Sequence, residues 1–249
     1  MFLNKNEFGK GDKCLIMLHG NSLDSTIFNP LIRELEDRFR IVLFCLPGHG
    51  SSPKLVKYKF NEISQILIKQ INHIDGKKVI LAHSLSGHLV LQNINSFENV
   101  SGIVCVGTPP LSAIDDIPKA FTSLGGLMHK ELWSDIELNE IVNSLARNNQ
   151  QTIREILLES DPTFRKALTT QEFFEGFKNE IGNLQKTNIK VSLLFSKDDG
   201  YINLSYCEKL DQVIKKPQIK TLFLGYGGHL PFFNYPEKFY KVICDLTNL

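Results

Sequence analysis

Short apolar runs of four to six residues recur along the chain. They are rich in Ile, Val, Leu and Phe, and most of them end at Gly, Pro, Ser or His. Because they are continuously apolar and do not alternate with polar residues, they indicate strands buried on both faces, as in a parallel sheet. The predicted strands are Cys14–Leu18, Ile41–Phe44, Lys78–Ala82, Gly102–Val106, Lys190–Phe195 and Ile219–Leu224.

Amphipathic segments with the period of a helix separate these runs. Alternating strands and helices predict an α/β fold, with a mostly parallel central sheet and helices on both of its faces. Right-handed crossovers would bring the C-terminal ends of the strands, and the loops after them, to one edge of the sheet. We therefore expect any functional site at that edge. The clearest helical repeats are Ile63, Ile66, Leu67, Ile71 and Ile74, and Phe239, Val242, Ile243 and Leu246.

Residues 111–186 interrupt this alternation, because they contain no convincing strand and several patterns typical of helix starts. We predict that they form a helical cap inserted between two strands and lying over the strand ends. Residues 1–110 and 187–249 would then form the α/β core. The expected cap helices, suggested by capping-box patterns at Ser134 and Thr169 and by Asp161-Pro162, lie near Ser134–Asn148, Thr152–Glu159, Pro162–Leu168 and Thr170–Asn179.

Composition and charge narrow the class of protein. The 249 residues carry 28 Lys and Arg against 27 Asp and Glu, so the net charge is +1 and we expect no nucleic-acid partner. A hydrophobic fraction of 42% supports a sizeable core and excludes disorder. No apolar run approaches the roughly 20 residues that span a bilayer, and the first residues lack the apolar stretch of a signal peptide. The sequence predicts a soluble, globular, cytoplasmic protein and gives no indication of its oligomeric state.

Metal and nucleotide cofactors are not expected. The five cysteines are scattered, and the seven histidines form neither a His-x-x-x-His pair nor a His-Glu-x-x-His motif. The segment Gly48–Pro53 is a near miss to a dinucleotide-binding fingerprint, because a proline stands where the third glycine should be. No acidic residue follows at the expected strand end.

The most informative segment surrounds Ser84. The apolar strand at residues 79–82 runs directly into this serine, and a helix-compatible segment follows it. A serine on a sharp strand-to-helix turn has its oxygen projecting and is typical of a nucleophile. Such a turn tolerates only small residues two positions before and after the serine, and Ala82 and Ser86 stand there in place of the usual glycines. We predict that Ser84 is a nucleophile. The alternative is an ordinary serine in a loop between a strand and a helix.

Two later strands deliver the other residues that a serine nucleophile needs. Asp198 and Asp199 follow one strand, and His229 follows the next in a glycine-rich loop. A serine hydroxyl is a poor nucleophile at neutral pH without a base such as imidazole, and a carboxylate must orient that imidazole. Serine, aspartate and histidine, each after a strand end and in this order, match one hydrolase architecture. The sequence predicts a Ser–His–Asp triad with either aspartate as its acid.

On these residues the sequence resembles the α/β-hydrolase superfamily, and within it the capped, cofactor-free serine hydrolases that include carboxylesterases. The resemblance covers nearly the whole chain. It rests on His19-Gly20, Pro47-Gly48-His49-Gly50-Ser51-Ser52, the Ala82–Ser86 turn, the acid loop at Asp199 and Gly228-His229.

The resemblance implies which aspartate belongs to the triad. In this family the acid usually ends a Gly-x-x-Asp pattern and is followed four residues later by proline. Residues 196–199 and Asn203 align with that pattern, which selects Asp199 over Asp198 as the partner of Ser84 and His229.

The resemblance also implies the reaction, which is hydrolysis of a carboxylic ester through an acyl-enzyme. The backbone N–H groups of Asn21 and Leu85 would stabilise the oxyanion, and no cofactor would take part. Aromatic and aliphatic residues in the cap favour a small apolar or aromatic ester-type substrate. The same triad also supports hydrolysis of a lactone, a carbon–carbon bond, an amide or a thioester, and acyl transfer. A ligand sensor with slow turnover is a further alternative.

Overall fold

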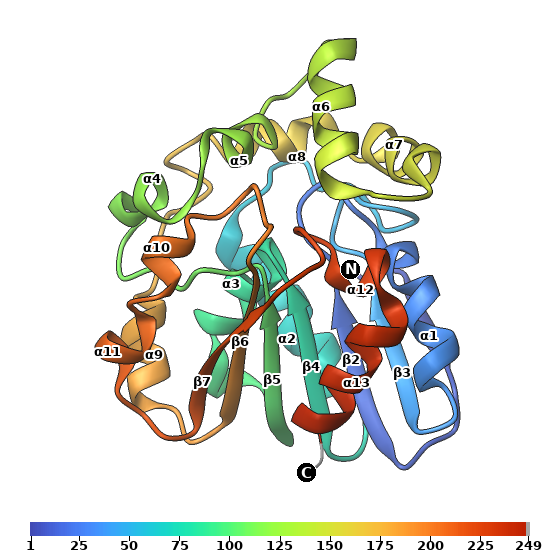
Figure 1. Cartoon of the computed structure of the whole chain (residues 1–249), viewed down its shortest axis with the longest axis vertical. Coiled ribbons are helices and arrows are strands. Elements are labelled where there is room, and N and C mark those ends of the chain that lie inside the picture. Colours follow the sequence, from blue (N-terminus) through green and yellow to red (C-terminus); the bar gives the residue numbers. More distant parts are fainter. Residues whose placement is uncertain (248–249) are drawn as a thin grey trace.

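The computed structural model describes residues 1–247 as a seven-stranded sheet covered by helices (Figure 1). The strand order is β1-β3-β2-β4-β5-β6-β7. Strand β1 runs antiparallel to β3, and the other neighbouring strands are parallel. The predicted α/β fold with a mostly parallel sheet is therefore confirmed. The strands are β1 (Lys5–Phe8), β2 (Lys13–Leu18), β3 (Phe39–Phe44), β4 (Lys78–His83), β5 (Val100–Val106), β6 (Lys190–Ser196) and β7 (Ile219–Leu224).

The apolar runs in the sequence coincide with β2 to β7, whose residues are mostly buried. Strand β1 has no counterpart among the predictions. Its four residues are all exposed at the edge of the sheet, so its sequence carries no apolar run. It is held by backbone pairing from Lys5↔Phe44 to Phe8↔Ile41.

Helices cover both faces of the sheet. On one face α2, α3, α9 and α11 pack over an apolar cluster that includes Ile16 and Ile63, and on the other α1, α12 and α13 pack over a cluster that includes Leu15 and Phe239. The helical periodicity at α2 and α13 is confirmed. The helices of these layers are α1 (Asn29–Leu35), α2 (Phe60–Asn72), α3 (Leu85–Leu91), α9 (Glu180–Lys186), α10 (Leu204–Cys207), α11 (Leu210–Ile214), α12 (Pro231–Asn234) and α13 (Pro236–Leu246).

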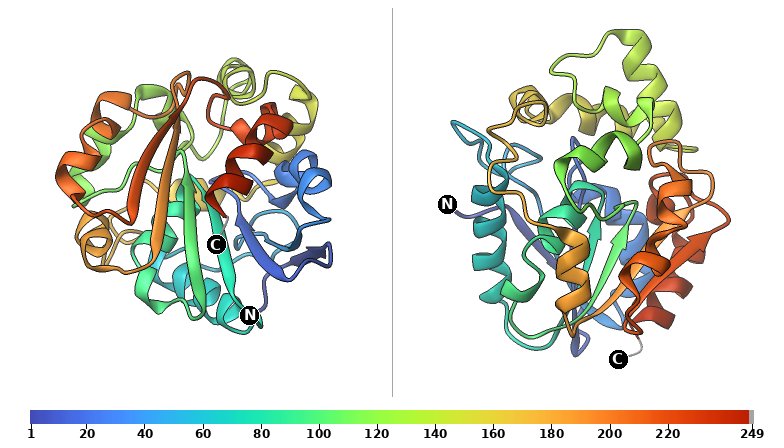
Figure 2. Two further views of the ribbon diagram at one scale, coloured as in Figure 1. Left: turned by 60° about the horizontal axis from the view of Figure 1, so that its bottom comes forward. Right: turned by 90° about the vertical axis from the view of Figure 1, so that its left-hand side faces the viewer.

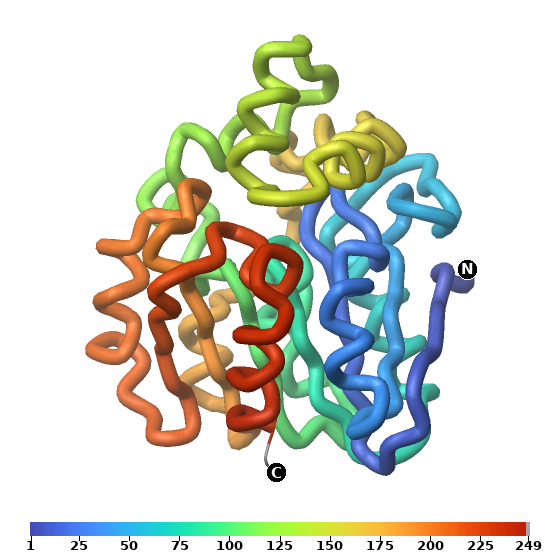
Figure 3. Tube along the Cα trace, turned by 45° about the vertical axis from the view of Figure 1, so that its right-hand side comes forward, coloured from blue at the N-terminus to red at the C-terminus, as the bar shows by residue number. Residues whose placement is uncertain are grey.

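Helices α4 to α8 lie across the C-terminal edge of the sheet (Figures 1 and 3). The side view in Figure 2 shows them above that edge only. Helix α9 ends the same stretch of chain but packs beside the sheet against α3 and α11. The helices over the edge are α4 (Ile117–Ala120), α5 (Ser123–Leu127), α6 (Asp135–Leu145), α7 (Gln150–Glu159) and α8 (Pro162–Ala167).

The helices expected near α6, α7 and α8 are confirmed, and Ser134 caps α6 as its pattern predicts. The helix expected at Thr170–Asn179 is wrong, because this segment forms turns. Its Phe173 is fully buried against aromatic rings, and the carboxylate of Glu172 pairs with lysines and does not cap a helix. Tertiary packing here overrides the local pattern.

Of the helices within residues 1–247, none has the length and apolar character that crossing a membrane requires.

Candidate active site

Ser84 lies on the sharp turn between β4 and α3. Its backbone has φ 50° and ψ −117°, a strained conformation for a residue with a side chain. The strain is held by two hydrogen bonds, since Ser84 N–H donates to the Val106 carbonyl at 2.8 Å and Thr108 Oγ1 donates to the Ser84 carbonyl at 2.9 Å. The hydroxyl of Ser86 donates to the His19 carbonyl and joins this turn to the loop after β2. The local geometry is that of a nucleophile-bearing turn.

His229 and Asp199 meet at the ends of β7 and β6. The distance from His229 Nδ1 to Asp199 Oδ2 is 2.8 Å, and both side chains are buried. Asp199 Oδ1 accepts the Tyr201 N–H at 2.9 Å, which fixes the rotation of the carboxylate. The Tyr201 ring packs against the His229 ring with 4.8 Å between centroids.

Asp198 points elsewhere. Its carboxylate accepts the N–H groups of Gly227 and Gly228 at 3.2 and 2.9 Å and pairs with Arg147 at 2.6 Å. It therefore joins the loop before His229 to the connection between α6 and α7, and it makes no hydrogen bond to the imidazole.

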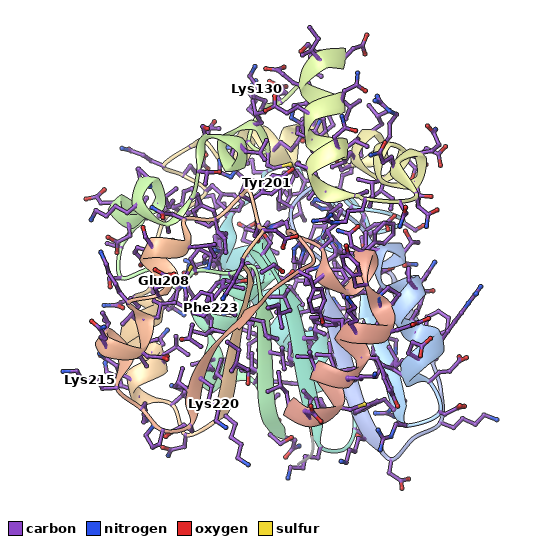
Figure 4. The ribbon with its side chains drawn as sticks, viewed as in Figure 1. Lys130, Tyr201, Glu208, Lys215, Lys220 and Phe223 are labelled. Atoms are coloured by element: carbon purple, nitrogen blue, oxygen red, sulfur yellow. The ribbon has the colours of Figure 1, made fainter. Side chains whose placement is uncertain are left out.

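Ser84 and His229 line one pocket of about 90 Å³ between the sheet edge and helices α4 to α8. Asn21 and Leu85 line it too, and within residues 1–247 no protein acceptor takes the backbone N–H of either. Figure 4 shows Tyr201, another residue of the pocket wall, beneath the helices that lie over the sheet edge. The remaining walls are mostly apolar and come from Leu23, Leu111, Ile117, Phe121, Met128, Leu145, Leu168 and Phe174.

Two buried imidazoles hold the loop that carries Asn21. His19 Nε2 accepts the Leu46 N–H at 2.9 Å, and its Nδ1 contacts the Gly20 carbonyl. His49 Nε2 accepts the Ser22 N–H at 3.1 Å. Burial lowers the pKa of His19 to about 4 and that of His49 to about 3, so both are neutral and accept through Nε2. Their hydrogen bonds join the loop after β2 to the loop after β3 and orient the Asn21 backbone.

His83 is a packed neighbour of the site. It is fully buried, its ring meets the His229 ring edge-on at 4.7 Å, and its Nε2 lies 3.0 Å from the His229 carbonyl. Burial lowers its pKa well below the ordinary value, so the neutral ring donates from Nε2 to that carbonyl.

The sequence reasoning missed two further imidazoles in the same pocket, those of His88 and His129. His88 lines the pocket from α3, and its Nδ1 lies 3.0 Å from the buried carboxylate of Glu180. The sequence held one signal for His88, because this residue lies in the helix predicted to follow the Ser84 turn. Glu180 lies 92 positions from His88 and had no such pattern.

Gly107 packs against the His229 ring, so a substitution at Gly107 tests whether the position of that ring matters for catalysis. A Cβ atom on Gly107 would lie 2.9 Å from His229 Cε1 and 3.0 Å from Nδ1, and its φ of +61° disfavours a side chain. We expect Gly107→Ala to displace the imidazole and lower kcat/KM for an activated ester by about a hundredfold, since a small misplacement of a reacting group is costly. Circular dichroism should show a retained fold. Gly126→Ala, where a Cβ meets nothing within 4 Å, is the control, and equal rates in the two variants would contradict the expectation.

The alpha/beta hydrolase family model matches residues 15–242, and the chain belongs to this family. The resemblance drawn from the sequence motifs is therefore confirmed. Solved structures agree in fold. An N-acyl homoserine lactonase, AidH, complexed with N-butanoyl homoserine superposes with a TM-score of 0.83 at 20% identity, covering 98% of this chain and 93% of that one. The esterase EaEST from Exiguobacterium antarcticum superposes with a TM-score of 0.78 at 19% identity, covering 98% and 94%.

Curated relatives are similar over nearly their whole length. The pimeloyl-[acyl-carrier protein] methyl ester esterase of Yersinia enterocolitica is 23% identical over 97% of this chain and 96% of its own. The protein of that name from Wigglesworthia glossinidia brevipalpis is 25% identical over 94% and 93%.

Proposed function

We propose that this protein is a serine hydrolase that cleaves carboxylic esters of small apolar or aromatic substrates. The observation that carries the proposal is the pocket itself, where a strained serine and an imidazole paired with a buried carboxylate face the same space. The names of the curated relatives and of one structural neighbour support an ester as the bond that is cleaved.

In the proposed reaction Ser84 Oγ attacks the ester carbonyl carbon while His229 removes its proton. The imidazole then returns that proton to the leaving alcohol, and an acyl-enzyme remains on Ser84. Water, deprotonated by the same imidazole, attacks the acyl carbon and releases the acid. Asp199 holds the Nδ1–H tautomer of His229 and stabilises the imidazolium that forms twice in each cycle.

The backbone N–H groups of Asn21 and Leu85 are the proposed donors to the oxyanion. Both residues line the pocket and both groups lack a protein acceptor among the described residues. Because these groups are fixed by the backbone, they stabilise negative charge as it develops without reorganising. The pocket volume of about 90 Å³ favours a small acyl group.

We further propose the division expected from the sequence, in which residues 111–186 cap a core of residues 1–110 and 187–249. The cap contributes most of the apolar walls of the pocket, and it contacts the Asn21 loop through a hydrogen bond of 2.8 Å from Asn21 Nδ2 to the Met128 carbonyl. Closing the cap over a bound ester would remove water and strengthen the hydrogen bonds to the oxyanion.

Hydrolysis of p-nitrophenyl esters from acetate to decanoate tests the proposal. We expect steady multiple turnover with an optimum at short chains, because the pocket is small. Matched assays of a γ-lactone, an anilide and a thioester of the same acyl length identify the bond that is cleaved fastest. A single slow turnover on all of these compounds would reject the esterase and favour the ligand sensor.

A further inference from the structure

Four histidines line the pocket, and two of them, His229 and His88, are held at Nδ1 by a buried carboxylate. His229 is paired with Asp199 at 2.8 Å and His88 with Glu180 at 3.0 Å. The mechanism uses only the first pair. The second pair is buried much as the first is, since Glu180 is fully buried and the His88 side chain is 10% exposed.

The carboxylate of Glu180 is satisfied within the protein. It accepts hydrogen bonds from His88 Nδ1, from Gln92 Nε2 at 3.0 Å and from the Leu111 N–H at 2.9 Å. Three donors converging on one carboxylate match the acceptor-only character of its ionised form. The carboxylate therefore fixes the orientation of the His88 ring and leaves the opposite edge, with Nε2, for the pocket.

His88 differs in this respect from His19 and His49, although His83, which also lines the pocket, leaves its Nδ1 without a protein partner within residues 1–247. His19 and His49 each use both ring nitrogens on protein groups. For His88 Nε2 the structure gives no protein partner within residues 1–247, although the ring lines a largely apolar pocket. A polar atom in such a place loses free energy unless a ligand or water pairs with it.

We propose that His88, positioned by Glu180, recognises an uncharged hydroxyl group on the substrate, and this inference rests on the proposed ester hydrolysis. A hydroxyl both donates and accepts, so it satisfies Nε2 in either protonation state of the ring. A substrate carboxylate is disfavoured, because the charge of Glu180 lies directly behind the imidazole and no Lys or Arg lines the pocket.

Ser84 and His88 line the same pocket, Ser84 from the turn before α3 and His88 from that helix. A substrate hydroxyl near His88 therefore lies in the same pocket as the ester carbonyl that Ser84 attacks. Both the acyl side and the alcohol side of an ester offer such a position.

Isosteric ester pairs test the inference on both sides of the bond. Ethyl 3-hydroxybutanoate is compared with ethyl 3-methylbutanoate, and 2-hydroxyethyl butanoate with propyl butanoate, with monoethyl succinate as the charged substrate. In the wild type we expect kcat/KM to favour the hydroxylated member of one pair about tenfold, the value of one well-made hydrogen bond. Monoethyl succinate should be the poorest substrate.

His88→Leu should reduce the preferred ratio to about one, while His73→Leu, at an exposed histidine outside the pocket, should leave it unchanged. Because His88→Leu leaves Glu180 buried without its partner, the paired variant His88→Leu with Glu180→Gln is made as well. Glu180→Gln alone should lower the ratio and raise KM more than it changes kcat, as expected of a positioning residue. Equal ratios in the wild type and these variants, or a preference for monoethyl succinate, would overturn the inference.

Measurements of ester binding distinguish a failure of this inference from a failure of the proposed function. The affinity of each ester for the Ser84→Ala variant, followed by ligand-observed NMR, does not depend on turnover. A hydroxyl preference in binding that disappears with His88→Leu supports the inference even if the wild type hydrolyses none of the esters. Hydrolysis without any hydroxyl preference supports the esterase and rejects the role of His88.

Discussion

Ser84→Ala is expected to lower kcat/KM for p-nitrophenyl butanoate by at least about ten-thousandfold. The substitution removes the only atom that can carry the acyl group in the proposed mechanism, and the residual rate would come from binding and from the oxyanion donors. Initial rates at several enzyme concentrations, with a burst of p-nitrophenol measured in the wild type, quantify the loss.

The fold should survive this change, because the strained turn is held by backbone hydrogen bonds and by Thr108 and not by the Ser84 hydroxyl. Thermal unfolding should therefore show a midpoint at or above that of the wild type. Ser51→Ala, at an exposed serine, is the matched control and should retain full activity. A Ser84→Ala variant that keeps more than a few per cent of the rate would mean that another group is the nucleophile.

Asp199→Asn is expected to lower kcat by about a thousandfold to ten-thousandfold. The amide oxygen would keep the hydrogen bond to the Tyr201 N–H, and the amide NH₂ would then face His229 Nδ1. An NH₂ group cannot accept the Nδ1–H, so the imidazole would adopt the tautomer that cannot take a proton from Ser84. Rates with p-nitrophenyl butanoate measure the loss.

Asp198→Asn is the companion variant, since it changes the neighbouring carboxylate in the same way. Asp198 supports the backbone of Gly227 and Gly228 and pairs with Arg147 at a half-exposed position, where an ion pair contributes little. We expect a loss of less than about tenfold. Losses of the same size in the two variants would show that the aspartates act together or that the assignment of Asp199 is wrong.

The fold was predictable because its signals are local. Strands β2 to β6 are mostly buried on both faces, so burial leaves an apolar run within each segment, and the edge strand β7 keeps such a run although it is only partly buried. The helices with strong caps, such as α6 and α8, were predictable for the same reason. Strand β1 and the turns at residues 170–179 were not, because the first is held by backbone pairing and the second by aromatic packing from distant segments.

In the candidate site, too, some features were predictable from the sequence and others were not. Ser84, His229 and the adjacent aspartates were predictable as residue types at strand ends, and their order along the chain suggested one constellation. The sequence by itself determined strands β2 to β7 and the helices with strong periodicity or caps, because these signals are encoded within each segment, and the family resemblance already favoured Asp199 over Asp198. Only the tertiary structure decided that β1 pairs with β3, that the Asp198 carboxylate contacts Arg147 and the Gly227–Gly228 backbone, and that Glu180 meets His88, because these contacts join segments that are distant in the sequence.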